Sequence, residues 1–513
     1  MNRKQRRAAA TSSTASLSPA FVEAFNAGLK LHEMGRLDDA EPFYMKAMAL
    51  NPSHALLISN LGVLYYARGD VERAIETQKR AIKLDPNLGI AHNNLGVALN
   101  RLERHEEAIP AFRRAIEIEP NNSRALNNLG DSLTKSGRFE ESIGYLKRTL
   151  ELDPQYAEAK SNMGMAYWGL GDIDGAISWL RASIALDPSL ATVHKNLGLV
   201  LLLKRDFAEG WIEYNYRLAA DGIPLRGGPD MPIWRGQNPG EGALFIFSEQ
   251  GVGDEILYAG LLPELTALGV RVVWETDGRL IPLIQRSFPN VRCVPRTMPP
   301  VVGSPAADVV AQLPAGSLGQ LFRPSMAHFP MNRKGYLSAD KARGQAYRAG
   351  FNLAPGEKLV GISWVSKNMA FGKYKSTTLT DWAEILRTPG VRFVDLQYGD
   401  TSVERAALRA QLGLTVEHVD GLDLRDDLDG MAALTSACDM IITVSNTTAH
   451  VAGALGLPTW VFVPVDGGKL WYWGAGTDST PWYPSISIIR QLERGVWGST
   501  LHIAAERLRA LPA

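Results

Sequence analysis

The sequence of 513 residues contains only two cysteines, Cys293 and Cys438, and they lie far apart. This excludes a disulfide framework or a zinc site of closely spaced cysteines, and it is typical of a protein in a reducing cytoplasm. Long apolar runs are also lacking, since none reaches the roughly 18 residues that a membrane helix needs. We therefore expect a cytoplasmic protein with no transmembrane segment.

The chain also lacks a charge surplus, because its 54 basic residues are balanced by 54 acidic ones. Nucleic-acid binders usually show a basic surplus, so no nucleic-acid partner is expected. Residues 1–20 carry four basic side chains but no apolar core of a secretory signal. We predict a disordered basic tail there. The alternative is that these basic residues make a weak contact with a membrane or a partner.

What the chain does have is a repeat of 34 residues. Each repeat carries an asparagine followed two residues later by a glycine, and prolines recur at the same interval. A period of this length with small residues at fixed positions predicts stacked helical hairpins. The pattern resembles tetratricopeptide repeats over residues 21–220, with five full repeats and a divergent sixth. The sixth ends in Trp211, Tyr214 and Tyr216, which we expect to pack as a cap against the next domain.

The repeated asparagine is the unusual member of this pattern, because its amide makes it a mediocre helix former. Its recurrence suggests a ladder of amides that could hold another polypeptide by its backbone. The residues predicted to contact this polypeptide are Asn60, Asn94, Asn128, Asn162 and Asn196. The alternative is that asparagine is common at this position in many tetratricopeptide repeats, where it serves stability or generic peptide binding.

After a Gly- and Pro-rich linker at 221–242, short β-rich runs alternate with helical stretches. The predicted strands fall into two sets: 243–248, 270–275, 291–294 and 308–313, then 359–365, 392–396, 416–419, 440–444 and 459–463. Apolar strands separated by amphipathic helices predict parallel sheets covered on both faces. We expect two Rossmann-like domains with a cleft between them, a reduced one at 243–345 and a second at 346–513.

The first candidate site is the turn at 248–255, where a strand ends, two glycines follow and a helix begins. Residues at the carboxyl end of a parallel strand face the binding crevice. Asp254 or Glu255 could act there as a general base. The alternative is that the acidic residue only caps the helix.

The second candidate is the turn 445–450, Ser-Asn-Thr-Thr-Ala-His, which runs from an apolar strand into a helix. Hydroxyls and free amides at a helix N-terminus favour phosphate. The alternative is an ordinary capped helix with a buried histidine. The residues of this turn predicted to bind a phosphate-bearing ligand are Ser445, Asn446, Thr447, Thr448 and His450.

Two further groups have weaker signals. Lys367, Lys373 and Lys375 could neutralise a leaving phosphate, or could form a solvated basic loop. The aromatic residues at 471–473 and 482–483 could stack on a base or sugar ring, or could pack against a neighbouring domain.

Taken together, these motifs resemble family 9 glycosyltransferases, which include the ADP-heptose:lipopolysaccharide heptosyltransferases. The resemblance implies a metal-independent, inverting GT-B enzyme that needs no cofactor besides its nucleotide-sugar co-substrate. It implies that Asp254 is the catalytic base, that Lys375 contacts the donor phosphate, and that the Ser-Asn-Thr-Thr-Ala-His turn binds the donor. The heptosyltransferases have Asp where this chain has Ser445, so a change of donor or a loss of activity is expected.

Tetratricopeptide repeats joined to such a domain also resemble O-GlcNAc transferase and, more closely in the catalytic motifs, bacterial flagellin glycosyltransferases. The sequence thus predicts an inverting glycosyltransferase acting on Ser or Thr hydroxyls of a protein held by the repeats, with flagellin as a candidate. One alternative is a glycosyltransferase of lipopolysaccharide or capsule whose repeats recruit an assembly partner. The other is an interaction scaffold without turnover.

Overall fold

The computed structural model describes residues 17–367, 372–465 and 470–511. They form two compact units, one ending at Pro188 and the other beginning at Ser189. Most of the predicted basic tail lies outside the described residues. The first helix, α2 (Pro19–Glu33), begins inside the predicted tail, because the Ser18 side chain caps it by accepting from Phe21 N at 3.2 Å. In the described part of the chain, no helix has both the length and the apolar character needed to span a membrane.

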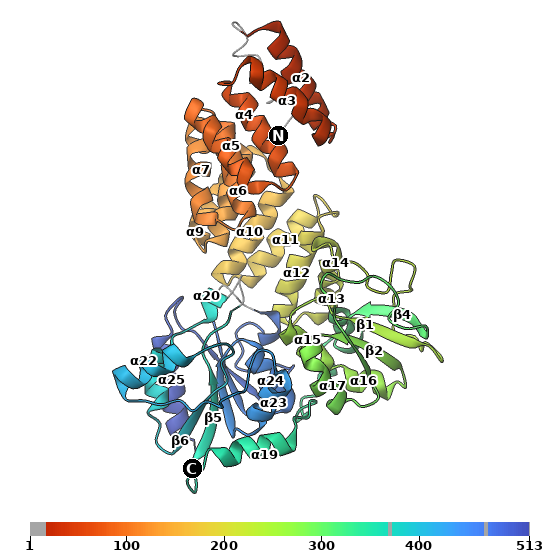
Figure 1. Cartoon of the computed structure of the whole chain (residues 1–513), viewed down its shortest axis with the longest axis vertical. Coiled ribbons are helices and arrows are strands. Elements are labelled where there is room, and N and C mark those ends of the chain that lie inside the picture. Colours follow the sequence, from red (N-terminus) through yellow and green to blue (C-terminus); the bar gives the residue numbers. More distant parts are fainter. Residues whose placement is uncertain (1–16, 368–371, 466–469, 512–513) are drawn as a thin grey trace. The chain divides into compact units, whose positions relative to one another are not determined.

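The first unit is a stack of antiparallel helix pairs, drawn in red to yellow in Figure 1. The pairs are α2 with α3 (Leu37–Leu50), α4 (Ala55–Ala67) with α5 (Val71–Leu84), α6 (Gly89–Arg101) with α7 (His105–Ile118), α8 (Ser123–Lys135) with α9 (Phe139–Leu152), and α10 (Ala157–Leu170) with α11 (Ile173–Ile184). The repeated glycines allow each pair to pack closely. A Cβ atom at Gly96 would come within 2.6 Å of Phe112, and one at Gly130 within 2.6 Å of Leu146.

The second unit begins with a sixth helical hairpin, not with the α/β region. The hairpin contains α12 (Ala191–Lys204), α13 (Phe207–Tyr214) and the short α14 (Arg217–Ala220). Trp211 explains why the unit begins earlier than the domain boundary predicted at residue 220. Its indole is fully buried, donates from Nε1 to the Arg323 carbonyl at 2.9 Å, and packs edge-on against Trp471 at 5.2 Å between ring centroids. Trp211 and Tyr214 are thus buried as expected of a cap, whereas Tyr216 is 41% exposed and stacks on His194 of the same hairpin.

Two parallel sheets follow. The first has the order β3-β2-β1-β4 and contains β1 (Ala243–Phe247), β2 (Arg271–Thr276), β3 (Arg292–Pro295) and β4 (Val309–Pro314). The second has the order β6-β5-β7-β8-β9 and contains β5 (Lys358–Ser363), β6 (Val391–Asp395), β7 (Met440–Val444), β8 (Thr459–Val463) and β9 (Ile486–Arg490). The strand order reverses beside β1 in the first sheet and beside β5 in the second, which marks the places where ligands bind in such sheets.

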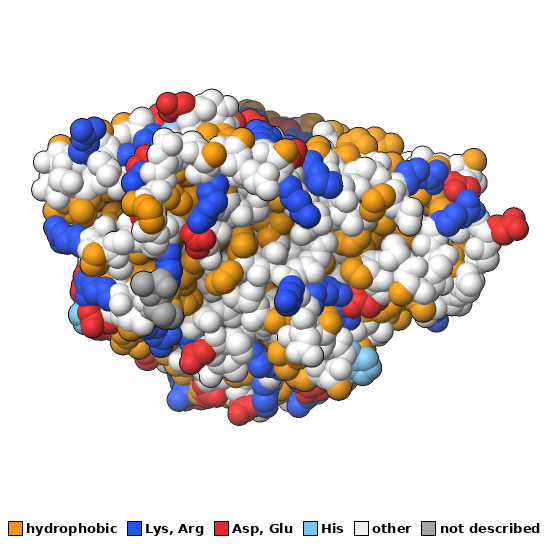
Figure 2. Space-filling view, turned by 90° about the horizontal axis from the view of Figure 1, so that it is seen from below, with side chains coloured by type: hydrophobic (Ala, Val, Ile, Leu, Met, Phe, Trp, Pro, Cys, Tyr) orange, Lys and Arg blue, Asp and Glu red, His pale blue; other side chains and the backbone are white. Residues whose placement is uncertain are grey.

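Helices cover these sheets, so central strands such as β1 and β7 are fully buried and nearly continuously apolar, whereas the edge strand β3 is partly exposed. Those that concern the site are α15 (Val252–Ala259), α16 (Leu262–Ala267), α17 (Ile281–Ser287), α23 (Leu428–Ser436) and α24 (Thr447–Leu455). Figure 2 shows Lys and Arg side chains and Asp and Glu side chains scattered over the same face of the molecule. That mixture agrees with the balanced charge of the sequence.

One strand prediction was wrong, and one strand was missed. Residues 416–419 form no strand, because Glu417 alone pairs with the edge of the sheet. Its N–H donates to Phe393 O at 2.8 Å, and its carbonyl accepts from Asp395 N at 2.9 Å. The prediction also missed β9, which extends the second sheet beside β8.

Candidate functional site

A cleft of about 520 Å³ lies in the second unit, at the carboxyl ends of strands from both sheets. Its walls come from the segments that follow β1, β2, β5, β6 and β7, together with α23. These include the places where the strand order reverses in each sheet. The side chains that matter for its chemistry are Asp254, Arg279, Lys367, Lys375, Tyr398, Arg425, Ser445, Thr447, His450 and Tyr472.

Asp254 lies half-buried in the first turn of α15 and lines the cleft. Burial raises the pKa of its carboxyl to about 7, and the negative charges of Glu249 and Glu255 add to the rise. A hydrogen bond from the Gly251 backbone and the charge of Lys375 act in the other direction. Asp254 therefore accepts a backbone hydrogen bond at the N-terminus of α15, and its carboxylate can also accept a proton near neutral pH.

Glu255, the other acidic candidate, points away from the cleft. Its buried carboxylate accepts from Thr276 Oγ1 at 2.6 Å and from Asp277 N at 2.7 Å, and it pairs with Arg296 at 2.9 Å. These bonds fix the end of β2. Of the two neighbouring carboxylates, only Asp254 is available to a ligand in the cleft.

Lys375 is buried in the short helix α20 (Gly372–Lys375) and lines the cleft. Burial lowers the pKa of its ammonium to about 8, while the charge of Asp254 opposes that fall. At neutral pH the lysine is still mostly cationic. Lys367 also lines the cleft, with its Nζ 5.6 Å from the centroid of the Tyr398 ring. The side chain of Lys373 lies outside the described residues.

Asn446 caps α24 and ties two strand ends together. Its Oδ1 accepts from Thr448 N at 3.0 Å, and its Nδ2 donates to Ser363 Oγ at 2.7 Å and to Val365 O at 3.1 Å. Because these bonds occupy the amide, Asn446 shapes the turn more than it offers groups to a ligand.

The other residues of this turn divide between the cleft and the core. Thr447 lines the cleft, whereas Thr448 is buried and donates to Leu396 O at 3.4 Å. Ser445 lines the cleft but is only 1% exposed, because its Oγ accepts from Trp473 Nε1 at 2.8 Å. The indole thus covers the hydroxyl at the position where the heptosyltransferases have an aspartate.

His450 is buried and bonds through Nδ1 to the Tyr483 hydroxyl at 2.9 Å. Burial and the charge of Lys375 lower its pKa to about 3, so the imidazole is neutral. Its ring lies against the turn that carries Asp254, since a Cβ at Gly253 would come within 2.9 Å of His450 Cδ2. The fold thus brings two of the predicted motifs into contact.

Most of the aromatic residues at 471–473 and 482–483, which could have stacked on a ligand, pack against other side chains instead. Trp471 and Trp482 surround Trp211 of the sixth hairpin, at 5.2 and 6.3 Å between ring centroids. Only Tyr472 of this group lines the cleft.

Sequence reasoning missed several residues of the cleft. Arg279 follows β2, and its Nη1 donates to the Arg425 carbonyl at 2.9 Å. Tyr398 and Gly399 follow β6. Each lies just after a predicted strand, so the rule that ligands bind at carboxyl ends could have found them.

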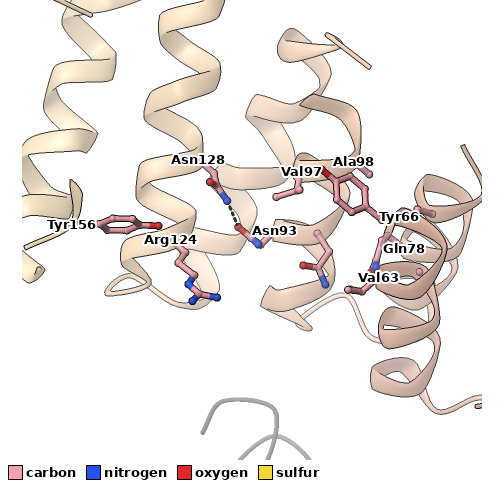
Figure 3. A pocket seen from close by; sticks show the side chains of 12 residues that line it. Val63, Tyr66, Gln78, Asn93, Val97, Ala98, Arg124, Asn128 and Tyr156 are labelled. Atoms are coloured by element: carbon pink, nitrogen blue, oxygen red, sulfur yellow. Dashed lines mark hydrogen bonds between the residues drawn. The ribbon is translucent and has the colours of Figure 1, made fainter. Parts of the chain in front are cut away.

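The asparagine ladder exists in the first unit, but it connects neighbouring repeats. Asn94 Nδ2 donates to Ser59 Oγ at 3.4 Å, Asn128 Nδ2 to Asn93 Oδ1 at 3.2 Å, and Asn162 Nδ2 to Asn127 Oδ1 at 3.0 Å. Figure 3 shows the second of these bonds. Each amide therefore donates one N–H between repeats, which leaves its second N–H and its carbonyl oxygen for a ligand.

A groove of about 260 Å³ lies on this side of the stack and is lined by Asn94 and Asn128, but not by the other ladder residues. Tyr66 borders one end, and Arg124 and Tyr156 border the other (Figure 3). Asn60 was predicted to contact the acceptor, but it is 3% exposed and donates to Leu56 O of its own helix at 2.9 Å. Asn196 lies half-buried in the second unit.

Among the described residues, no group of three or more His, Cys, Asp and Glu side chains is arranged to hold a metal ion.

Tetratricopeptide repeat family models match residues 24–54, 54–121, 87–155, 127–191 and 162–223. The chain is also 34% identical over 334 residues to Protein FlbA of Caulobacter vibrioides. That match covers 61% of this chain and 54% of the relative, so the chain spans about half the length of the curated relative it matches.

Two solved structures are each similar to part of this chain. YrrB, described as a TPR protein with an unusual peptide-binding site, is 24% identical with a TM-score of 0.30, over 37% of this chain and 95% of that one. PilF of Pseudomonas aeruginosa is 20% identical with a TM-score of 0.34, over 39% and 90%. The family models confirm the predicted repeats: the N-terminal part of this chain is a tetratricopeptide-repeat array, followed by a region of two parallel α/β sheets.

Proposed function

We propose that the chain is an inverting, metal-independent GT-B glycosyltransferase that moves a sugar from a nucleotide-sugar donor to a hydroxyl of a protein. One observation carries this proposal. Asp254 lies in the same cleft as Lys375 and the start of α24, where the strand order of both sheets reverses. This combination supplies a proton acceptor beside groups that favour phosphate.

The chemistry is a single displacement. The acceptor hydroxyl oxygen attacks the anomeric carbon while the bond from that carbon to the donor phosphate breaks. Asp254 accepts the hydroxyl proton, because a carboxyl with a pKa of about 7 is well matched to that transfer at neutral pH. One displacement from the opposite face inverts the anomeric centre.

The negative charge that develops on the leaving diphosphate is offset by Lys375, which lines the same cleft. Thr447 and the backbone at the start of α24 provide further donors. Neutral His450 can hydrogen-bond to the donor without adding charge. Ser445 is covered by Trp473, which favours a donor other than ADP-heptose.

The repeat array is the proposed binding site of the protein acceptor. Its groove presents the amides of Asn94 and Asn128 with two tyrosines and one arginine. Uncharged amides suit the backbone of an extended segment that carries a Ser or Thr. Flagellin is the first acceptor to test, because the motifs resemble those of flagellin glycosyltransferases.

The experiment incubates the full chain with a panel of sugar nucleotides and flagellin, followed by mass spectrometry of the intact acceptor. A donor-dependent gain of one sugar mass is expected. We expect Asp254→Asn to lower the transfer rate at least ~100-fold, the usual contribution of a general base, while sugar-nucleotide affinity stays within about threefold. Full activity of Asp254→Asn would exclude that residue as the base. Donor-dependent transfer to glycans but not to proteins would assign the enzyme to the alternative class.

A further inference from the structure

The sixth helical hairpin extends into the loop that carries the proposed base. Arg217 from α14 pairs with Glu249, which lies after β1 and five residues before Asp254. The Arg217 Nη2 and Glu249 Oε1 atoms are 2.6 Å apart, and both side chains are 1% exposed. The pair therefore lies in the interior of the second unit.

Several neighbours hold this pair in place. Glu249 Oε1 also accepts from Gly316 N at 3.1 Å, while Arg217 donates to Asn215 Oδ1 at 3.1 Å and to Ser317 Oγ at 3.2 Å. The next residue along the loop, Gln250, donates from its side-chain amide to the Tyr214 hydroxyl. The hairpin thus anchors two successive residues just before the Gly-Val-Gly-Asp turn.

The carboxylate of Glu249 is not fully used by these bonds. Its second oxygen, Oε2, is buried and has no hydrogen-bond partner within the described part of the chain. An unpaired buried charge is costly, and Arg217 is the cation that pairs with this carboxylate. The carboxylate of Glu249 is thus held in place five residues before Asp254.

We propose that Arg217 and Glu249 are positioning residues for Asp254: the pair fixes the loop that carries the base and places a negative charge next to it. This inference rests on the proposed function, in which Asp254 accepts the proton of the acceptor. The sixth hairpin would then contribute to catalysis by positioning Asp254.

The charged and titratable groups around Asp254 determine the direction of the effect. Glu249 and Glu255 raise its proton affinity, and Lys375 lowers it. Tyr214, Tyr258, Tyr472 and His450 also lie close, but burial keeps the tyrosines and the histidine neutral. Removing the charge of Glu249 therefore makes Asp254 a weaker base that deprotonates at lower pH.

The test uses the full chain with Glu249→Gln, which keeps the shape and the acceptor oxygen. The acid limb of the pH profile of kcat/KM is expected to move down by ~0.5 to 1 pH unit, because one negative charge near Asp254 is removed. The matched control is Glu264→Gln, whose carboxylate pairs with the buried Arg323 and does not line the cleft. Its profile should not move.

If Glu249→Gln leaves Arg217 unpaired and does not fold, the double variant Arg217→Met with Glu249→Gln removes both charges. Because this variant also removes the positive charge of Arg217, its acid limb is expected to move in the same direction by a smaller amount. A folded variant of either kind with an unmoved acid limb overturns the proposal.

A second measurement does not depend on catalysis. The difference in Tm between each parent and its Asp254→Asn derivative, followed against pH, reports the titration of Asp254. Its inflection should lie near pH 7 in the natural chain, where the carboxyl has a pKa of about 7. It should move down in Glu249→Gln and stay in Glu264→Gln. If the inflection moves but the protein transfers no sugar, the role of Arg217 and Glu249 stands and the proposed function is overturned. If the enzyme is active but the inflection does not move, the proposed function stands and the role of the pair is overturned.

Discussion

At the scale of single residues, the proposed mechanism depends on two neighbouring ionisable groups. Asp254 must be deprotonated to accept a proton, so the rate rises as the pH passes its pKa of about 7. Lys375 must be protonated to offset the leaving phosphate, so the rate falls as the pH passes its pKa of about 8. We predict a narrow bell-shaped profile of kcat/KM against pH, measured with the full chain and a protein acceptor.

The alkaline limb can be assigned with one substitution. Lys375→Arg keeps the positive charge at every accessible pH, since the guanidinium does not deprotonate in this range. This variant is expected to lose the alkaline limb and to keep the acid one, even if its rate is lower. A profile of the natural enzyme that is flat from about pH 6 to about pH 9 would contradict both assignments.

The same residues show how far the sequence could lead. Asp254 and Glu255 are adjacent and chemically alike, so local sequence could not choose between them. The choice depends on Thr276 and Asp277 at the end of β2, which bind Glu255 and leave Asp254 to the cleft. Arg217 carried no local signal either, because its partner Glu249 lies 32 positions further along the chain.

At the scale of elements, the turn between β1 and α15 allows a matched comparison of two glycines. A methyl group at Gly253 would lie 2.9 Å from His450 Cδ2, whereas at Gly251 the nearest atom would be Asp254 Oδ2 at 3.7 Å. His450 is held by Tyr483 and surrounded by aromatic rings, so it cannot move away freely. We predict that Gly253→Ala costs ~1–3 kcal/mol of stability, as overpacking does, and weakens donor binding.

Gly251→Ala is the control, because its φ of −81° suits any residue and the space is open. Thermal unfolding and calorimetric titration with the sugar nucleotide measure the two effects. Equal behaviour of the two variants would mean that the contact between His450 and the turn is not needed.

The repeat helices offer a second prediction at this scale. Replacing Asn94 and Asn128 by alanine should raise the KM for the protein acceptor and leave the donor Kd unchanged. It should also lower stability, because each amide bonds to the preceding repeat and such a bond contributes ~0.5–1.5 kcal/mol. Asn121→Ala is the control: its exposed amide accepts from Arg148 and is not part of the groove. An unchanged acceptor KM would reduce the ladder to a stabilising role.

Elements also show where strand prediction succeeds. The runs at 440–444 and 459–463 became β7 and β8 with the predicted bounds, because each is mostly apolar and almost entirely buried. The run at 416–419 is apolar only in part, and a single paired residue did not extend into a strand. β9 was missed because it is a short run that directly follows Pro484 and Ser485 and is interrupted by Ser487.

At the scale of the whole molecule, the period of the sequence and the packing of the chain disagree about where the array ends. The 34-residue pattern places the sixth hairpin with the repeats, whereas its contacts place it with the α/β region. Beyond Trp211 and Arg217, Arg205 donates to Thr477 Oγ1 at 2.8 Å and to Ser479 O at 2.7 Å. The hairpin therefore touches the parts of the chain that carry both sheets.

This leads to a prediction about where the chain can be divided. A fragment of residues 189–513 keeps the hairpin and should be soluble, unfold cooperatively and bind the donor. A fragment of residues 221–513, cut at the boundary that the repeat period suggests, should aggregate. It would expose the apolar surface around Trp471 and Trp482 and leave the buried Glu249 without Arg217. Expression, gel filtration and thermal unfolding of the two fragments test this prediction. A stable 221–513 fragment that binds the donor would show that the α/β region folds without the hairpin.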